Sequence, residues 1–410
     1  MRSSAKALAL APLALALLAA PAAARRRQQQ NPLAQPVVYK MAGTDKVEVR
    51  RDVTYKTEGD TTLKLDLYLP PGTADGARLP VVVFINGVGD PPANSGTPRV
   101  KEWGQYTSWP RLAAASGMAA VTYESRGTEA DADADDLLDY LRKNAAALKI
   151  DENRLSIWAC SANVRAGLSA AMQPGRSYVK SAVFYYGFMG LPAVRADVPI
   201  FIARAGYDNL QLNNTLDAYV RRALEAEAQV TLVNYADGQH AFDVRDDTER
   251  SREIIRQTLD FIKFHFTPGG EVKAAAPGRA PSPARFYAII SNEGVQKALQ
   301  AYADARRSDP SAFILQEGFI NALGYQLMQE RKVKEAVEIL KLNVSSYPDS
   351  ANTYDSLADA YEADGQKELA IQFSEKALEM LAKSGLNEQQ AAPIRNSAQQ
   401  KLQRLKPAAK

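Results

Sequence analysis

The sequence predicts an α/β domain, built on a mostly parallel sheet with helices on both faces, followed by an all-helical domain. Two observations predict this class. Strand-like and helix-like segments alternate from Val37 to about Pro268, which is the pattern of a parallel sheet covered by helices. Beyond residue 285 no strand pattern remains, and similar segments recur at a spacing close to 34 residues. Such a period is typical of stacked helical repeats.

The strands are predicted from apolar patterning. Leucine alternates with mostly polar residues over 63–69, which indicates a half-buried strand. Continuous apolar runs, as over 81–85, are expected of strands covered on both faces. The remaining predicted strands are 118–123, 155–160, 180–186, 199–205 and 230–235, and the predicted helices of this domain are 129–148, 216–228 and 248–264.

The first 24 residues have the pattern of a secretory signal peptide. Arg2 and Lys6 precede an Ala/Leu run over 7–20 that is too short to span a membrane as a stable helix. Ala22 and Ala24 then provide an A-x-A cleavage site. We therefore expect a periplasmic or secreted mature protein without a transmembrane span; an uncleaved N-terminal anchor is the alternative.

A linker separates the two predicted domains. Residues 269–285 are rich in proline, glycine and alanine, which is typical of a linker. It divides an α/β domain over 37–268 from a helical domain over 286–405. In the helical domain, Ala336 and Ala370 head similar segments 34 residues apart. This stretch resembles tetratricopeptide repeats, which implies a surface for a protein partner.

Composition argues against several classes of function. The chain has 50 basic and 47 acidic residues, for a net charge of +3, and no long basic stripe, so a nucleic-acid partner is not expected. Its single cysteine excludes an internal disulfide. With two histidines and no cluster of Cys and His, it has no pattern typical of a transition-metal site. We therefore expect no metal and no cofactor.

Ser161 is the most informative residue of the chain. It ends the predicted strand 155–160, and a helix-compatible segment follows it, as in a nucleophile elbow, where a serine lies on a sharp strand-to-helix turn. The usual G-x-S-x-G pattern has Ala159 and Asn163 at its outer positions here. Cys160 is interpreted as a buried small residue. The alternative for Ser161 is an ordinary helix cap.

An acid and a histidine follow Ser161 in the order expected of a catalytic triad. Asp208 and His240 each come after a late predicted strand, at the edge of the sheet where ligands collect. Histidine accepts a serine proton near neutral pH, and a carboxylate orients the imidazole. Asp237 and Asp243 flank His240 and are alternatives to Asp208. The other histidine, His265, ends the last predicted helix of the domain and is expected to be a surface or capping residue.

Backbone N–H groups are expected to bind the oxyanion that forms during acyl transfer. The candidates are Ala162, which follows the serine, and Gly87 or Val88, which follow the predicted strand 81–85. The long loop after these residues contains Trp103 and Tyr106. These two aromatic residues are candidates for substrate binding; packing of the loop onto the sheet is the alternative.

The stretch 47–266 resembles the dienelactone-hydrolase-like serine esterases of the α/β-hydrolase superfamily. The motifs that carry this resemblance are Asn86-Gly-Val-Gly89, Cys160-Ser-Ala162, Arg204-Ala-Gly-Tyr-Asp208 and Gly238-Gln-His-Ala-Phe242. The resemblance implies the α/β-hydrolase fold, a Ser–His–Asp mechanism and carboxylic-ester chemistry. Dienelactone hydrolases have a cysteine nucleophile where this chain has Ser161, so their lactone substrate is not implied.

We therefore expect an exported serine hydrolase that cleaves a small-molecule carboxylic ester through an acyl-enzyme intermediate. Two alternatives remain open. The first is a catalytically degenerate hydrolase scaffold whose helical repeats bind a protein partner, motivated by Ala159 and Asn163 at the elbow. The second is a serine peptidase that uses the same triad.

Overall fold

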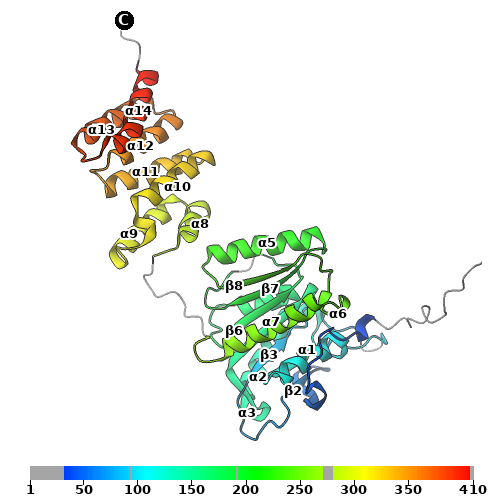
Figure 1. Ribbon diagram of the computed structural model, residues 1–410. Helices are drawn as coiled ribbons and strands as arrows, with labels where there is room; N and C mark the ends of the chain where they lie inside the picture. Colours follow the sequence, from blue (N-terminus) through cyan, green and yellow to red (C-terminus); the bar gives the residue numbers. More distant parts are fainter. Residues whose placement is uncertain (1–31, 93–94, 191–192, 271–279, 407–410) are drawn as a thin grey trace, which may run out of the picture.

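The computed structural model describes residues 32–92, 95–190, 193–270 and 280–406. Within these residues, eight strands form one mixed sheet in the order β1-β2-β4-β3-β5-β6-β7-β8 (Figure 1). The first two pairings, β1 with β2 and β2 with β4, are antiparallel, and all the others are parallel. This order, with helices on both faces, is the α/β-hydrolase fold, so the predicted fold class is confirmed. The strands are β1 (Glu48–Glu58), β2 (Thr61–Leu69), β3 (Leu79–Phe84), β4 (Ala119–Tyr123), β5 (Ile150–Cys160), β6 (Val179–Tyr185), β7 (Ile200–Ala205) and β8 (Val230–Tyr235).

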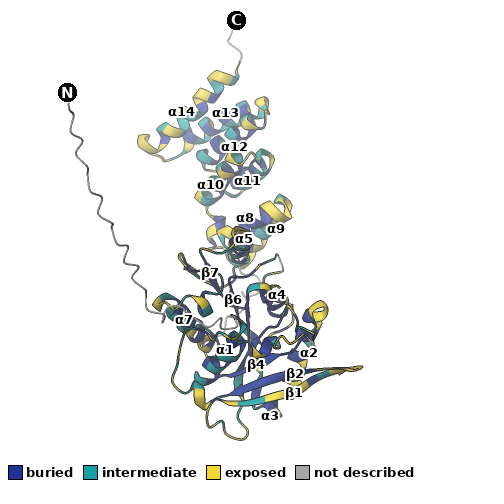
Figure 2. Cartoon of the chain, turned by 90° about the vertical axis from the view of Figure 1, so that its right-hand side faces the viewer, coloured by how far each residue is buried: buried dark blue, intermediate teal, exposed yellow. Residues whose placement is uncertain are grey.

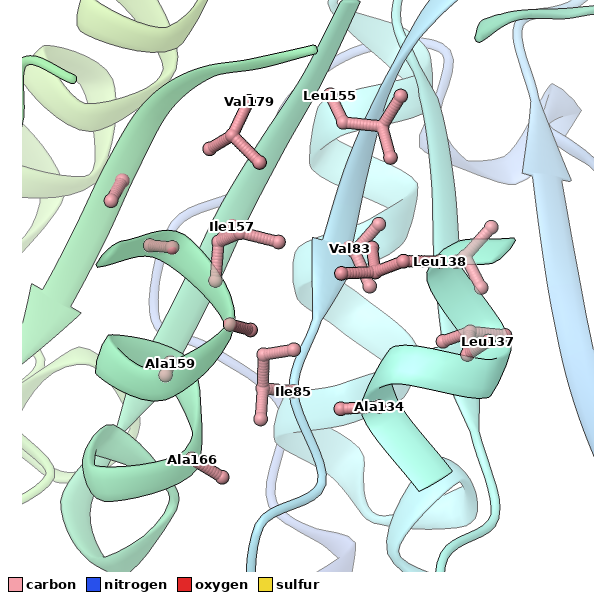
Figure 3. Close-up of a cluster of buried hydrophobic side chains, with 14 of the residues drawn as sticks. Val83, Ile85, Ala134, Leu137, Leu138, Leu155, Ile157, Ala159, Ala166 and Val179 are labelled. Atoms are coloured by element: carbon pink, nitrogen blue, oxygen red, sulfur yellow. The ribbon is translucent and has the colours of Figure 1, made fainter. Parts of the chain in front are cut away.

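Alternation along the central strands divides the core into two layers. Val81 and Val83 of β3 pack with Leu137 and other residues of α2, α4 and α5, whereas Val82 packs on the opposite face with residues of α1 and α7, because successive side chains of a strand point to opposite faces. Figure 3 shows the first layer, with Val83 beside Leu138 and with Leu137 on the same helix. The helices of this part are α1 (Gly104–Ala115), α2 (Ala130–Lys143), α3 (Ala145–Leu148), α4 (Val164–Met172), α5 (Leu210–Glu225), α6 (Phe242–Arg245) and α7 (Glu249–Phe266).

Strand β1, helix α1 and the short helix α6 were absent from the sequence prediction. Strand β1 is an edge strand in which Tyr55 is the buried residue, so its polar sequence shows no apolar alternation. The outer end of the β1–β2 hairpin is exposed (Figure 2). Helix α1 begins within the loop expected over 90–109, continues beyond it to Ala115, and contains Pro110. The predicted helix 129–148 is interrupted at Asn144, which separates α2 from α3.

Beyond residue 280 the described chain is helical. Consecutive helices pack as hairpins, α8 with α9, α10 with α11 and α12 with α13, and α14 packs against α12 and α13. Gly324 permits a close approach of α10 to α11, because a Cβ atom there would lie 2.6 Å from the Leu340 side chain. These helices are α8 (Pro283–Glu293), α9 (Val295–Ser308), α10 (Glu317–Gln329), α11 (Val333–Ser346), α12 (Ala351–Ala363), α13 (Lys367–Lys383) and α14 (Glu388–Leu405).

Some sequence predictions fall on residues that the structure does not describe. The signal peptide over 1–24 lies entirely outside the described residues, and the linker over 269–285 lies partly outside them. Its last three residues belong to α8, which begins at Pro283. Just before α8, the backbone N–H of Ser282 donates to the Glu227 carboxylate at 2.6 Å. Of the helices in the described part of the chain, none is both long and apolar enough to cross a membrane.

Candidate active site

Ser161 lies on a strained turn between β5 and α4. Its φ angle is 53°, in the left-handed region that non-glycine residues rarely adopt and that is associated with functional sites. Small neighbours permit this turn. A Cβ atom at Gly167 would lie 2.5 Å from Ala159 Cβ, and one at Gly187 would lie 2.5 Å from the Ser161 carbonyl oxygen. The backbone around the serine thus has the geometry expected of a nucleophile elbow.

Ser161, His240 and Asp208 form one chain of hydrogen bonds. Ser161 Oγ lies 2.8 Å from His240 Nε2, and His240 Nδ1 lies 2.7 Å from Asp208 Oδ2. The Asp208 side chain is buried, whereas the His240 side chain is 35% exposed. Asp208 also accepts a hydrogen bond from the Asn209 N–H through its other oxygen, at 2.7 Å. The three side chains follow β5, β7 and β8, whose carboxyl ends lie at one edge of the sheet.

The two alternative acids lie elsewhere. Asp237 is exposed. Asp243 is fully buried and accepts hydrogen bonds from Tyr186 Oη at 2.5 Å, Trp109 Nε1 at 2.7 Å and Gln105 Nε2 at 2.8 Å. Burial raises the pKa of the Asp243 carboxyl, although these three hydrogen bonds act in the opposite direction.

Tyr186 connects Asp243 with His240. The Tyr186 ring packs against the His240 imidazole with 4.9 Å between ring centroids, while its hydroxyl is held by Asp243. The buried Asp243 thereby holds the Tyr186 ring in place beside the His240 imidazole. No sequence motif marks Gln105 or Tyr186 as members of this group, because they come from α1 and from the end of β6.

Asn163 connects the elbow with the loop after β3. Its Oδ1 accepts hydrogen bonds from the backbone N–H groups of Gly87 at 2.7 Å and Val88 at 3.0 Å. Its Nδ2 donates to Tyr106 Oη at 2.7 Å, and that hydroxyl donates to the Ile85 carbonyl at 2.9 Å. The structure thus departs from the expectation that Gly87 and Val88 present their N–H groups to a substrate, because both groups already donate to this carboxamide.

The aromatic residues proposed for substrate binding occupy different positions. Tyr106 is 2% exposed, and its hydroxyl contacts the Ile85 carbonyl, Asn163 Nδ2 and Cys160 Sγ inside the protein, so it packs against the elbow. Trp103 is half-buried and donates from Nε1 to the Pro98 carbonyl at 3.1 Å. The geometry of Tyr106 is that of the packing alternative.

Neither Cys160 nor His265 has the environment of a reactive group. Burial raises the pKa of the Cys160 thiol to about 12, so the nucleophilic thiolate does not form near neutral pH. His265, expected at the surface or as a cap, is instead 5% exposed. Its Nδ1 lies 2.7 Å from the Gly270 carbonyl oxygen, and burial lowers the pKa of its imidazole.

Four exposed apolar side chains lie in the chain segments that carry or adjoin the residues of this site. Val88 and Phe188 are each 42% exposed, Tyr207 is 71% exposed and Leu210 is 75% exposed. They lie in the segments that follow β3, β6 and β7, next to the elbow loop, Gly187 and Asp208. We call these four side chains the apolar rim. Among the described residues, no group of three or more His, Cys, Asp or Glu side chains is placed to hold a metal ion.

Comparisons with known proteins give structural neighbours only. No protein-family model matches the chain, and no curated protein sequence matches it. The chain is similar to solved structures of Thermogutta terrifontis esterase 2. The native form is 20% identical, with 56% of this chain and 96% of that chain covered and a TM-score of 0.45. The form phosphorylated by paraoxon is 19% identical, with 56% and 97% covered and the same TM-score.

Proposed function

We propose that this protein is a serine hydrolase that cleaves carboxylic esters through an acyl-enzyme intermediate. The observation that carries the proposal is the hydrogen-bonded chain from Ser161 through His240 to Asp208, with the serine on a strained turn. A serine hydroxyl is a weak nucleophile unless a base accepts its proton. This arrangement provides the base and the group that orients it.

Each residue has a defined role in the proposed reaction. Ser161 Oγ attacks the acyl carbon of the ester while His240 Nε2 accepts the hydroxyl proton. Asp208 holds the Nδ1–H of His240 and stabilises the imidazolium. The proton then passes to the leaving alcohol, which departs as the acyl-enzyme forms. A water molecule, deprotonated by His240, releases the carboxylic acid and restores Ser161. The N–H of Ala162 is the proposed oxyanion donor at the elbow.

The apolar rim supports an ester with apolar groups as the substrate. Val88, Phe188, Tyr207 and Leu210 expose apolar side chains in the segments that follow β3, β6 and β7, and burial of such surface by a ligand is favourable. We assign Trp103 to the outer part of this site, because it lies half-buried at the start of α1.

The remaining parts of the proposal concern the whole chain. The protein is exported after removal of residues 1–24, residues 37–268 form the catalytic domain, and the linker runs from residue 269 to the start of α8 at Pro283. Residues 286–405 are tetratricopeptide-like repeats that hold a protein partner. The recurrence of similar segments 34 residues apart and the packing of consecutive helices as hairpins support this part.

One observation favours a second candidate function. Asn163 engages the N–H groups of Gly87 and Val88, the donors that a hydrolase would direct at its substrate. A scaffold that had lost catalysis, and that acted only through binding by its helical repeats, would tolerate this arrangement. Activity of Ser161 distinguishes the two candidates.

The test is covalent labelling of the purified full chain with a fluorophosphonate probe, mapped by mass spectrometry. We expect one adduct on Ser161, absent from Ser161→Ala and retained in Ser116→Ala, a matched change at the end of α1, where the hydroxyl bonds to the Leu112 carbonyl. A folded protein without an adduct would reject the hydrolase in favour of the binding scaffold. Turnover of a nitrophenyl ester but not of the matching nitroanilide would separate an esterase from a peptidase.

A further inference from the structure

Asn163 stands where the elbow pattern usually has glycine, two residues after the serine. Its residue exposure is 5%, so the carboxamide is enclosed by protein. Buried polar groups need hydrogen-bond partners, and Asn163 has them on both sides: the Gly87 and Val88 N–H groups on Oδ1 and the Tyr106 hydroxyl on Nδ2.

The contacts of Oδ1 are those of an oxyanion. Donors of an oxyanion hole lie about 2.7–3.1 Å from the oxygen that they stabilise, and Oδ1 lies 2.7 Å from the Gly87 nitrogen and 3.0 Å from the Val88 nitrogen. Each backbone N–H carries one hydrogen, so a bond directed at Asn163 is not available to a substrate oxygen. The carboxamide therefore competes with the substrate for both loop donors.

The loop is also held in this arrangement by packing. A Cβ atom at Gly87 would lie 2.7 Å from Ala166 Cβ and 3.1 Å from Asn163 Cα, which shows how closely the loop approaches α4. The hydrogen bond from Asn163 to Tyr106, and from Tyr106 to the Ile85 carbonyl, fixes the orientation of the carboxamide. Its oxygen therefore faces the loop, because its nitrogen is bound to Tyr106.

We infer that Asn163 is an internal occupant of the oxyanion hole, a brake that limits the rate at which Ser161 is acylated. The inference rests on the proposed serine-hydrolase function. With the carboxamide in place, the Ala162 N–H acts at the elbow without the loop donors. Removing one such donor from a hydrolase lowers kcat by roughly 10²–10³-fold, so releasing the loop donors should increase the rate.

The first measurement compares the rate of fluorophosphonate labelling and kcat/KM for a nitrophenyl ester in Asn163→Gly, Asn163→Ala and the unmodified chain. We expect both variants to react about 10- to 100-fold faster, since the released N–H groups of Gly87 and Val88 then bind the oxyanion. Asn163→Asp should react more slowly than the unmodified chain, because its carboxylate occupies both donors and repels the developing negative charge. Ser161→Ala combined with Asn163→Ala should not be labelled.

A second measurement reports the contact without activity. Amide hydrogen exchange at Gly87 and Val88 should be faster in Asn163→Ala than in the unmodified chain, with exchange in β5 unchanged as evidence that the variant folds. Unchanged exchange at both amides would overturn the inferred occupancy. If one variant does not fold, the other carries the comparison, since glycine and alanine both remove the carboxamide.

The outcomes separate this inference from the proposed function. An active unmodified chain with slower Asn163→Gly and Asn163→Ala variants would retain the hydrolase and overturn the brake. An unlabelled unmodified chain with labelled variants would support the brake and show that the natural protein is a silenced hydrolase. Absence of labelling in all of them, with the variants folded, would overturn both.

Discussion

The α/β region (residues 32–270) and the helical region (residues 280–406) bury polar side chains in different ways. In the α/β region, the buried Asp208 side chain pairs directly with His240, which stays partly exposed. The buried Asp243 accepts a hydrogen bond from Tyr186, whose ring packs against the same imidazole. In the helical region, Lys401 of α14 pairs with Asp355 and Asp359 of α12 and links two helices. Burial of charge therefore indicates a reactive site only where the network ends at an accessible group.

The sharpest test of this comparison uses the two histidines. His240→Ala should lower the rate of Ser161 labelling by about 10³-fold, because general-base catalysis contributes roughly 10²–10⁴-fold, while the melting temperature stays nearly unchanged. His265→Ala should do the opposite. It leaves the Gly270 carbonyl without its partner and creates a cavity where the buried ring packs, so the melting temperature falls and the labelling rate at 25 °C is kept.

The labelling rate and the melting temperature together distinguish a reactive from a structural role for each histidine. Labelling rates are measured at a temperature at which both variants are folded by circular dichroism. Equal labelling of His240→Ala and the unmodified chain would remove His240 from the site and end the triad proposal. A loss of labelling in folded His265→Ala would mean that the two histidines are not separable into reactive and structural roles.

The sequence predicted the central strands well because their environment repeats along the chain. Leu63, Leu65 and Leu67 alternate, and all three face one buried layer. The edge strand β1 escaped detection since it buries little beyond Tyr55, and helix α1 was hidden by Pro110. An element buried on one side has a periodic pattern of apolar residues in its sequence, whereas an exposed edge strand has none.

The residues of the site also fall into those that a local sequence pattern predicts and those that it does not. Ser161, Asp208 and His240 could be proposed because each follows a recognisable strand, and the structure brings them together. The bond between Asn163 and the loop after β3 joins residues 76 positions apart, and it depends on a closeness of two loops that no local pattern records. The same holds for the contact of Tyr186 with His240.

Two buried lysines, one in each region, give the next prediction. Lys101 pairs with Asp52 and Asp66 in the α/β region. Replacing Lys101 by methionine leaves the buried Asp66 with only the exposed Arg51 as its cation. Replacing Lys401 removes the cation that Asp355 and Asp359 share. Breaking a buried ion pair costs about 3–5 kcal/mol, and the loss should be smaller for Lys101→Met, because Asp66 keeps a partner. Chemical unfolding should show this loss in both variants. Only Lys101→Met should also change the rate of Ser161 labelling. Lys101 lies in the short helix Val100–Glu102, which follows the loop after β3 that contains Gly87 and Val88.

The pH dependence of the Lys101 contribution has a definite sign. Burial lowers the pKa of Lys101, but hydrogen bonds to Asp52 and Asp66 outweigh burial and raise it above its ordinary 10.5. A lysine whose pKa is higher in the folded state contributes stability that is fully present below the pKa of the unfolded chain and is lost as the pH rises through the folded value. The difference in unfolding free energy between Lys101→Met and the unmodified chain should thus be constant near pH 8 and shrink above about pH 10.5. A difference that shrank between pH 6 and 8 would contradict this assignment.

The smallest expected effect concerns exposed apolar residues, which both regions also possess. Phe188 belongs to the apolar rim, whereas Phe313 of the helical region is 55% exposed far along the chain from the triad residues. If the rim contacts the acyl or alcohol group of the ester, Phe188→Ala should raise KM for long-chain esters by about 5- to 30-fold, the equivalent of about 1–2 kcal/mol of lost apolar contact. It should leave acetate esters nearly unaffected, because a short acyl group does not reach the ring. Phe313→Ala should change KM for neither class of ester.

Kinetics over a series of acyl lengths provides the measurement. A chain-length-independent effect of Phe188→Ala would mean that the ring positions the Ser161 turn through Gly187, and the substrate would then be bound by other parts of the sheet edge.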